Sequence, residues 1–163
     1  MAIPPRNEND AKTAPYTRTF FVTTKTSMGR RLLQSDRFAA LFVDVLRSCM
    51  IARRFRVDDF VVMPDHVHLL VSVRGDVSIE KAMQFIKGGF SFRLKSRLDV
   101  WMRSFNESQI MSEEKFRSCL RYIEENPVRR GLVRSPSEYQ FGSARCGALD
   151  PMPSHFAAIG GPG

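Results

Sequence analysis

Two spacings of hydrophobic residues alternate along this chain. Residues 17–26, 57–63 and 67–73 are rich in β-branched and aromatic side chains, which is typical of β-strands. Only a few residues beginning with Pro64 separate the second and third of these segments, so we expect a tight antiparallel hairpin. A short fourth strand is expected within residues 100–110.

Between these strands the apolar residues recur at helical spacing. In residues 36–50 they occupy positions 38, 41, 42, 45, 46, 49 and 50, and Ser35 or Asp36 is the expected N-cap. Residues 78–98 show the same period and predict a second helix, in which Gly88-Gly89 marks a kink or weak point. The chain therefore alternates strands with amphipathic helices.

A third helix follows the last predicted strand. Ser112 is its expected N-cap, and Glu113 and Glu114 lie at its positive end. We expect it to end near Asn126, because Pro127 biases the residue before it away from helical backbone. The order β-α-β-β-α-β, followed by one more helix, predicts an α+β, ferredoxin-like antiparallel sheet with an additional C-terminal helix. That fold hosts many functions, so the order of elements decides nothing about chemistry.

The charge of the chain favours a polyanionic partner. Its 163 residues hold 25 Lys and Arg against 17 Asp and Glu, which gives a net charge of +8 and a pI near 9.9. A merely basic surface is the alternative. No apolar run approaches the roughly 20 residues of a membrane span, and the polar, Pro-rich start carries no secretion signal, so we expect a cytoplasmic protein without membrane contact. The three cysteines form no CxxC pair and support neither a disulfide framework nor a structural zinc site.

Two of the three histidines lie in the third predicted strand, in the sequence DHVHLLVSV of residues 65–73. Alternate strand residues share a face, and the face assigned to the helix-covered core holds Val67, Leu69, Val71 and Val73. The opposite face holds His66, His68, Leu70 and Ser72. The two imidazoles lie about 7 Å apart at Cα and can converge on one ion. Neutral imidazole suits Zn, Mn, Ni and Cu, whereas Mg prefers oxygen ligands. Alternatively, His66 closes the turn and His68 is an ordinary polar residue on an open sheet face.

The third predicted helix carries a tyrosine beside its apolar stripe. The stripe consists of Phe116, Cys119, Leu120 and Ile123. Tyr122 lies roughly 110° from the centre of this stripe. Asn126 is one turn further on and projects from the same flank. On periodicity alone, a half-buried boundary tyrosine is the better interpretation.

Two motifs stand about fifty residues apart: FVVMPDHVHLLVSV at residues 60–73 and LRYIEENPVRRGLV at residues 120–133. Together they resemble the REP-associated tyrosine transposases, relatives of the bacterial single-tyrosine HUH transposases. HUH stands for His-hydrophobic-His, which here is His66-Val67-His68. The resemblance extends from about Thr19 to Ser143.

The resemblance implies a metal-dependent enzyme that cleaves and rejoins single-stranded DNA through a 5′-phosphotyrosine intermediate. Tyr122, on the additional C-terminal helix, would be the nucleophile, and His66, His68 and Asn126 the ligands of a divalent ion, Mg or Mn. The implied substrate is a palindromic repeat that folds into a hairpin. A phenol with an unperturbed pKa near 10 is a poor nucleophile at neutral pH. A divalent cation can polarise the phosphate and orient the leaving oxygen.

Basic residues near these motifs are candidates for DNA binding. They are Arg129 and Arg130 after the tyrosine, Lys115 on the same flank of its helix, and Lys87 and Arg93 on the basic face of the second helix. For Lys115, a solvated surface lysine is the competing interpretation. The DNA partner adds association with the nucleoid to the expected cytoplasmic location, and the resemblance favours a monomer.

The expected organisation is a flexible arm at residues 1–15, an HUH tyrosine transposase catalytic domain at residues 16–134 and a loosely structured tail at residues 135–163. One alternative function is a non-catalytic basic nucleic-acid-binding module or repressor with a ferredoxin-like fold. It explains charge and fold but makes the histidine pair a coincidence. Another is a metal-dependent hydrolase, which would need further ligands, and Asp65 is the only obvious acid near the histidines. A covalent protein–DNA adduct separates the transposase from both.

Overall fold

Four antiparallel strands form one sheet in the computed structural model, which describes residues 16–51 and 55–146. The strands are β1 (Tyr16–Lys25), β2 (Phe55–Val62), β3 (His66–Arg74) and β4 (Asn106–Ile110), in the order β2-β3-β1-β4. Every residue of β3 is buried, as expected for a central strand. The antiparallel pairing confirms the predicted α+β fold and the hairpin between β2 and β3.

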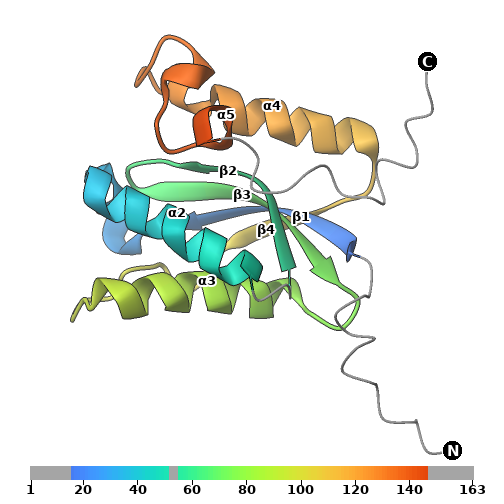
Figure 1. The fold of residues 1–163 in the computed structure, drawn as a ribbon, viewed down its shortest axis with the longest axis horizontal. Helices are drawn as coiled ribbons and strands as arrows, with labels where there is room; N and C mark the ends of the chain where they lie inside the picture. The colour runs from blue at the N-terminus through green and yellow to red at the C-terminus, as the bar shows by residue number, and fades with distance from the viewer. Residues whose placement is uncertain (1–15, 52–54, 147–163) are drawn as a thin grey trace, which may run out of the picture.

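The helices lie on both sides of this sheet (Figure 1). They are α2 (Asp36–Ile51), α3 (Ile79–Leu94), α4 (Glu113–Arg129) and the short α5 (Ser143–Cys146), with 3-10 turns η1 (Ser27–Gly29), η2 (Leu32–Gln34) and η3 (Pro136–Glu138). Figure 1 shows α2 and α3 on one side and α4 with α5 on the other. None of the helices in the described part of the chain combines the length and hydropathy needed to cross a membrane.

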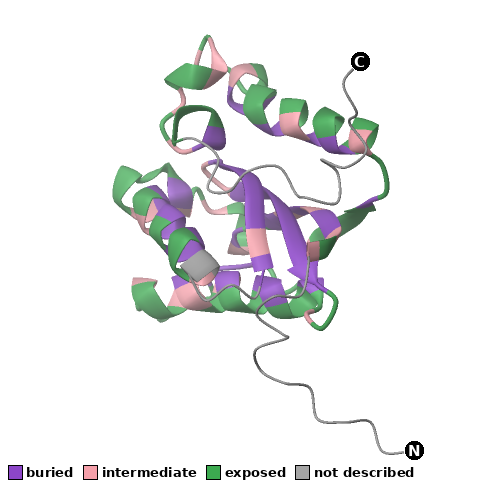
Figure 2. Ribbon diagram, turned by 45° about the vertical axis from the view of Figure 1, so that its right-hand side comes forward, coloured by how far each residue is buried: buried purple, intermediate pink, exposed green. Residues whose placement is uncertain are grey.

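The two faces of the sheet pack against different helices, which confirms the face assignment made for β3. Val67, Leu69, Val71 and Val73 belong to the large core cluster that includes side chains of α2 and α3. Leu70 instead packs with side chains of α4 in a second, smaller cluster. In Figure 2 the strands of the central sheet are mostly buried, and the helices turn their exposed residues outwards.

The second helix is shorter than predicted and has no break at its glycines. It ends at Leu94 because Lys95 adopts a left-handed conformation (φ 54°) and its backbone N–H donates to Ser91 O, a common way to end a helix. α3 runs continuously through Gly88 and Gly89. A Cβ on Gly89 would lie only 3.3 Å from Val45 Cγ1 of α2, so this glycine allows a close approach of the two helices instead of a kink.

The third helix continues through Pro127 to Arg129, so the predicted end near Asn126 is wrong. Proline has a helical φ and lacks only the backbone donor. Its carbonyl accepts from Leu132 N–H, and Arg130 N–H donates to Asn126 O, so the turn after the proline stays bonded. Burial of Pro127 against the protein outweighs the local bias.

Residues 135–146 are not loosely structured, which corrects the prediction for that part of the tail. Val62 N–H donates to Phe141 O, and Gly142 forms an antiparallel bridge with Val61 at the outer edge of β2. The hydroxyl of Tyr139 donates to Val62 O, and Ser143 Oγ accepts from Phe60 N–H at 2.8 Å. The predicted arm at residues 1–15 and the remainder of the tail, residues 147–163, lie outside the described residues.

Candidate active site around Tyr122

The two histidines lie side by side at the start of β3, with their ring centroids 4.7 Å apart. Both are buried, and each has a partner at Nδ1. His66 Nδ1 lies 2.7 Å from Asp65 Oδ1, and His68 Nδ1 lies 2.8 Å from Thr23 Oγ1 on β1. In protein metal sites an imidazole bonded in this way at one nitrogen presents the other nitrogen to the metal. The Nδ1 contacts of the two rings make the other nitrogen of each, Nε2, the candidate metal-binding atom.

Electrostatics keeps His68 neutral at physiological pH. Burial, together with the charges of His66 and Arg130, lowers the pKa of His68 to about 3. Burial alone would raise the pKa of Asp65, but the hydrogen bond and charge of His66, with a further contribution from Arg130, lower it instead. A neutral imidazole is the form that binds a metal ion.

Helix α4 places Tyr122 over the histidine face of the sheet. The Ser112 side chain caps the helix by accepting from Lys115 N–H at 3.1 Å. Phe116, Cys119, Leu120 and Ile123 pack on the sheet, as the apolar stripe predicted. Tyr122 lies on the flank of that stripe and is 38% exposed. Its ring stands edge-on to His68, with centroids 5.3 Å apart, so residues more than fifty positions apart in sequence meet here.

Asn126 lies one turn beyond Tyr122 and is only 4% exposed. Among the described residues its side-chain oxygen, Oδ1, has no hydrogen-bond partner. A buried polar atom without a partner costs about 1–3 kcal/mol, which a bound ligand would offset. No group of three or more His, Cys, Asp or Glu side chains in the described ranges fits a metal ion. The amide oxygen of Asn126 is therefore the candidate third ligand beside the two histidines, and two imidazoles with one amide oxygen form a donor set that suits a divalent cation.

Three of the five basic candidates lie near Tyr122. Lys115 lines a cavity that ends at the tyrosine. The Arg129 guanidinium lies 5.1 Å from the centre of the Tyr122 ring and also pairs with Glu125 at 3.0 Å. The charge of Arg130 contributes to the pKa shifts of Asp65 and His68. Three positively charged side chains of α4 and its C-terminal end therefore lie near Tyr122 or the histidines.

The other two basic candidates lie on α3, across the sheet from α4. Lys87 Nζ donates to Met102 O at 2.8 Å, and burial lowers its pKa. Arg93 donates to Ser48 Oγ of α2 at 2.8 Å. The structure does not bring them together with Tyr122.

The structure adds several residues to the site whose roles the sequence did not assign, among them Asp65, the one obvious acid near the histidines. Thr23 and Asp65 orient the histidines, Phe21 contacts both His68 and Tyr122, and Lys25 is the strand partner of His66. Alternation along β1 places Phe21, Thr23 and Lys25 on one face. Which histidine each one meets depends on the register with β3, and no sequence pattern gave that register.

Residues 20–126, which include most of the sheet and the histidine pair, match the family model for IS200-like transposases. The match spans more than half of the chain, so the chain belongs to the IS200-like transposase family, in agreement with the resemblance found in its motifs. A REP-associated tyrosine transposase of Escherichia coli (strain K12) is 28% identical over 92 residues. That alignment covers 56% of this chain and 55% of the relative, so the chain spans about half the length of the curated relative it matches.

Two solved structures share the fold. A REP-associated tyrosine transposase bound to a REP hairpin matches with a TM-score of 0.70 at 23% identity, covering 94% of this chain and 90% of that one. A putative transposase from Deinococcus radiodurans R1 matches with a TM-score of 0.52 at 22% identity, covering 67% of this chain and 91% of the other. At these identities the likeness concerns the fold alone.

Proposed function

We propose that this protein is a metal-dependent single-stranded DNA endonuclease and strand transferase that uses Tyr122 as its nucleophile. The observation that carries the proposal is the meeting of Tyr122 with the His66–His68 pair. The buried, unpartnered oxygen of Asn126, one helical turn beyond Tyr122, supports it. The substrate is single-stranded DNA with a palindromic hairpin repeat. Membership of the transposase family, the net charge of +8 and a fold shared with a REP-hairpin-bound transposase support this choice.

In the proposed reaction the phenol oxygen of Tyr122 attacks the phosphorus of one phosphodiester. A Tyr–O–P bond forms and the P–O3′ bond breaks, so the 5′ phosphate becomes linked to the protein. The phenol loses its proton to solvent, and the leaving 3′ oxygen takes up a proton to become a hydroxyl. Attack of a 3′-hydroxyl on the phosphotyrosine reverses the step without an external energy source, because the ester bond is conserved.

The surrounding side chains have separate roles in this proposal. His66, His68 and Asn126 hold a divalent cation, Mg or Mn, which when bound polarises the phosphate and offsets its developing charge. Asp65 and Thr23 fix the orientation of the two imidazoles. Arg129 packs over the Tyr122 ring and holds it toward the sheet.

Arg130 and Lys115 complete the proposed site at its rim. The charge of Arg130 acts on the Asp65–His68 end of the site, and Lys115 lies before Tyr122 on the same helix. In this proposal both side chains neutralise phosphates of a bound strand.

Covalent trapping tests the proposal. Purified protein is mixed with labelled hairpin oligonucleotides derived from repeats near its own gene, in the presence of Mn or Mg, and analysed on denaturing gels. We expect label to travel with the protein, and we expect the adduct to disappear in Tyr122→Phe and with chelator. Tyr16→Phe is the matched control, because it removes another phenol far along the sheet from His68, and it should retain the adduct.

Tight binding of the hairpins without any adduct, in both metals and across several repeats, would contradict the proposal. That result would favour a non-catalytic nucleic-acid-binding module. Strand cleavage without label on the protein would instead indicate hydrolysis by an activated water.

A further inference from the structure

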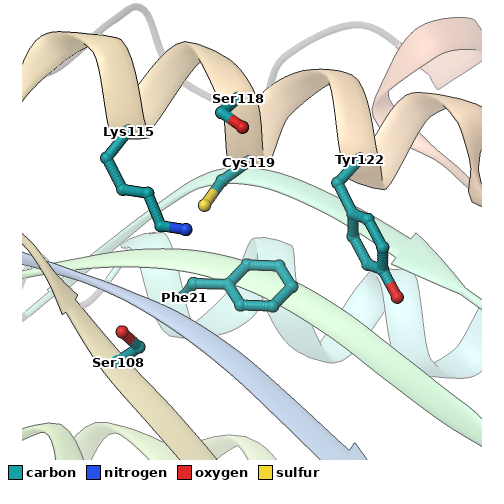
Figure 3. A pocket seen from close by; sticks show the side chains of 6 residues that line it. All are labelled: Phe21, Ser108, Lys115, Ser118, Cys119 and Tyr122. Atoms are coloured by element: carbon teal, nitrogen blue, oxygen red, sulfur yellow. The ribbon is translucent and has the colours of Figure 1, made fainter.

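A cavity of about 210 Å³ opens beside Tyr122, between α4 and the strands below it. Its lining comes from three elements: Phe21 of β1, Ser108 of β4, and Lys115, Ser118, Cys119 and Tyr122 of α4. In Figure 3 the side chains of Lys115 and Cys119 extend from the helix toward the ring of Phe21, and the Ser108 hydroxyl points up from the strand. The metal-ligand candidates His66, His68 and Asn126 are not part of this lining.

The size of the cavity limits what it can hold. Pockets for drug-sized ligands begin at roughly 300 Å³. A volume of about 210 Å³ therefore fits a smaller planar group, of the size of a single nucleobase. The β-strand side of the cavity ends at β4, an edge strand whose first four residues are exposed, so a chain can enter from solvent.

The lining has the chemistry of a base site. Phe21 offers an aromatic ring, and base–aromatic contact is the main sequence-tolerant interaction of single-stranded DNA with proteins. Ser108 and Ser118 bring two hydroxyls, each able to donate or accept a hydrogen bond at a base edge. Lys115 brings one positive charge, which suits the phosphate attached to that nucleotide.

The ring of Phe21 also connects the cavity to the reaction centre. It stacks on His68 with centroids 5.5 Å apart and meets the Tyr122 ring edge-on at 5.8 Å. An occupant of the cavity would contact Phe21 and Tyr122 together, so it would lie within about one nucleotide of the phosphate that the tyrosine attacks.

We propose that this cavity binds one unpaired nucleobase flanking the attacked phosphodiester, so that Phe21, Ser108 and Ser118 position the strand and select the cut site. The inference rests on the proposed function, since it assumes DNA at Tyr122. It adds a nucleotide-binding subsite that the metal-ligand candidates do not supply.

An abasic scan tests the subsite. Oligonucleotides that form the covalent adduct are remade with a single abasic nucleotide at each position around the mapped cut, and their affinity for Tyr122→Phe protein is measured by fluorescence anisotropy. At one flanking position we expect the abasic change to weaken binding between about 5-fold and about 150-fold, the range of one base–aromatic contact. Positions further from the cut should change less.

Two variants fill the cavity from different elements. Ser118→Trp adds a large side chain from the exposed surface of α4, and Ser108→Phe adds one from edge strand β4, where aromatic residues are well tolerated. In either variant we expect intact DNA to bind as weakly as the abasic DNA at that position, with the abasic effect reduced to less than 2-fold. Arg121→Ala, on another face of α4, is the control and should preserve the full abasic effect.

Lys115→Ala gives a separate readout. It should reduce the salt dependence of binding by about one phosphate contact while preserving the abasic effect. The subsite is refuted if an adduct forms but no flanking abasic position matters, or if the abasic effect persists in both filled variants. Absence of any adduct, by contrast, refutes the proposed function itself.

Discussion

The two faces of the sheet bury different kinds of side chain. The face under α2 and α3 is part of an almost entirely apolar core of 23 buried residues. The face under α4 has an apolar cluster of only seven buried residues. Beside that cluster lie the buried polar residues Thr19, Asp58, Asp59, His66, His68 and Ser72. One face therefore supplies the hydrophobic stabilisation of the fold, which allows the other face to carry polar groups.

Hydrogen bonds compensate much of the polar burial under α4. Thr19 Oγ1 and Ser72 Oγ are 2.6 Å apart, Ser72 donates to Asp58 Oδ2, and Arg56 pairs with Asp58 at 2.8 Å. The register of β2 shifts between Val57 and Asp59, so one extra residue is inserted there and both acids reach this face. The same strand that packs the apolar core thus also contributes carboxylates to the opposite side.

Neighbouring residues of β3 give the largest test of this comparison. Leu69→Ala leaves a hole in the apolar core and should lower the free energy of unfolding by about 2–5 kcal/mol. His68→Ala, one residue earlier and on the other face, should cost much less stability but reduce adduct formation on the order of 1,000-fold. Urea denaturation and covalent trapping measure the two effects. The comparison fails if His68→Ala unfolds the protein as readily as Leu69→Ala does.

The elements of the fold could be predicted from the sequence because each has one face in a core, and burial imprints a period on the sequence. The exceptions depend on contacts that no local pattern contains. Lys95 ends α3 in a conformation more typical of glycine, and Pro127 stays inside α4 because it is buried. Residues 135–146 pack through Tyr139 and Gly142 on β2, more than seventy positions away.

The candidate site likewise contains residues that the sequence indicated and residues that only the structure shows. The resemblance selected Tyr122 and the histidine pair, and the structure brings those residues together. In the sequence, Thr23 and Phe21 could not be distinguished from ordinary strand or core residues, because strands contain threonine and phenylalanine anyway. Their role depends on strand register, which becomes visible only in three dimensions.

The pH dependence of the free energy of unfolding measures what it costs to bury Asp59 on the α4 face of the sheet. Burial raises the pKa of the Asp59 carboxyl from 3.8 to about 6. A hydrogen bond with Ser143 opposes this shift, and the charge of Glu124 adds to it. Because the folded state then binds the proton more tightly than the unfolded state, this group destabilises the fold as pH rises from 4 through 6. A shift of about two units corresponds to roughly 3 kcal/mol.

Asp59→Asn removes that titration. Relative to the unmodified protein, the variant should be more stable at pH 7 than at pH 4, by up to roughly 3 kcal/mol of difference. Urea unfolding across this range measures it. A stability difference that stays constant from pH 4 to pH 7 would show that Asp59 does not titrate with a raised pKa.

Two adjacent threonines of β1 sharpen the comparison further. Thr24 is fully buried, and among the described residues its hydroxyl has no hydrogen-bond partner, so Thr24→Val should raise the free energy of unfolding by about 1–3 kcal/mol. Thr23 contacts His68 Nδ1, so Thr23→Val should preserve stability within about 1 kcal/mol but reduce adduct formation about 10- to 100-fold. If Thr23→Val leaves trapping unchanged, Thr23 does not orient His68.

The smallest expected effect concerns the two glycines of α3, which lie on the apolar side of the sheet. In a helix, Gly→Ala stabilises by roughly 0.5–1 kcal/mol. Gly88 has open space where a Cβ would be, so Gly88→Ala should show this full gain. At Gly89 the new Cβ would press on Val45 at 3.3 Å, so Gly89→Ala should gain less than Gly88→Ala or lose stability. Thermal unfolding of the two variants side by side decides the point. Equal gains would mean that α2 and α3 are not closely packed at Gly89 and that the apolar face tolerates added volume there.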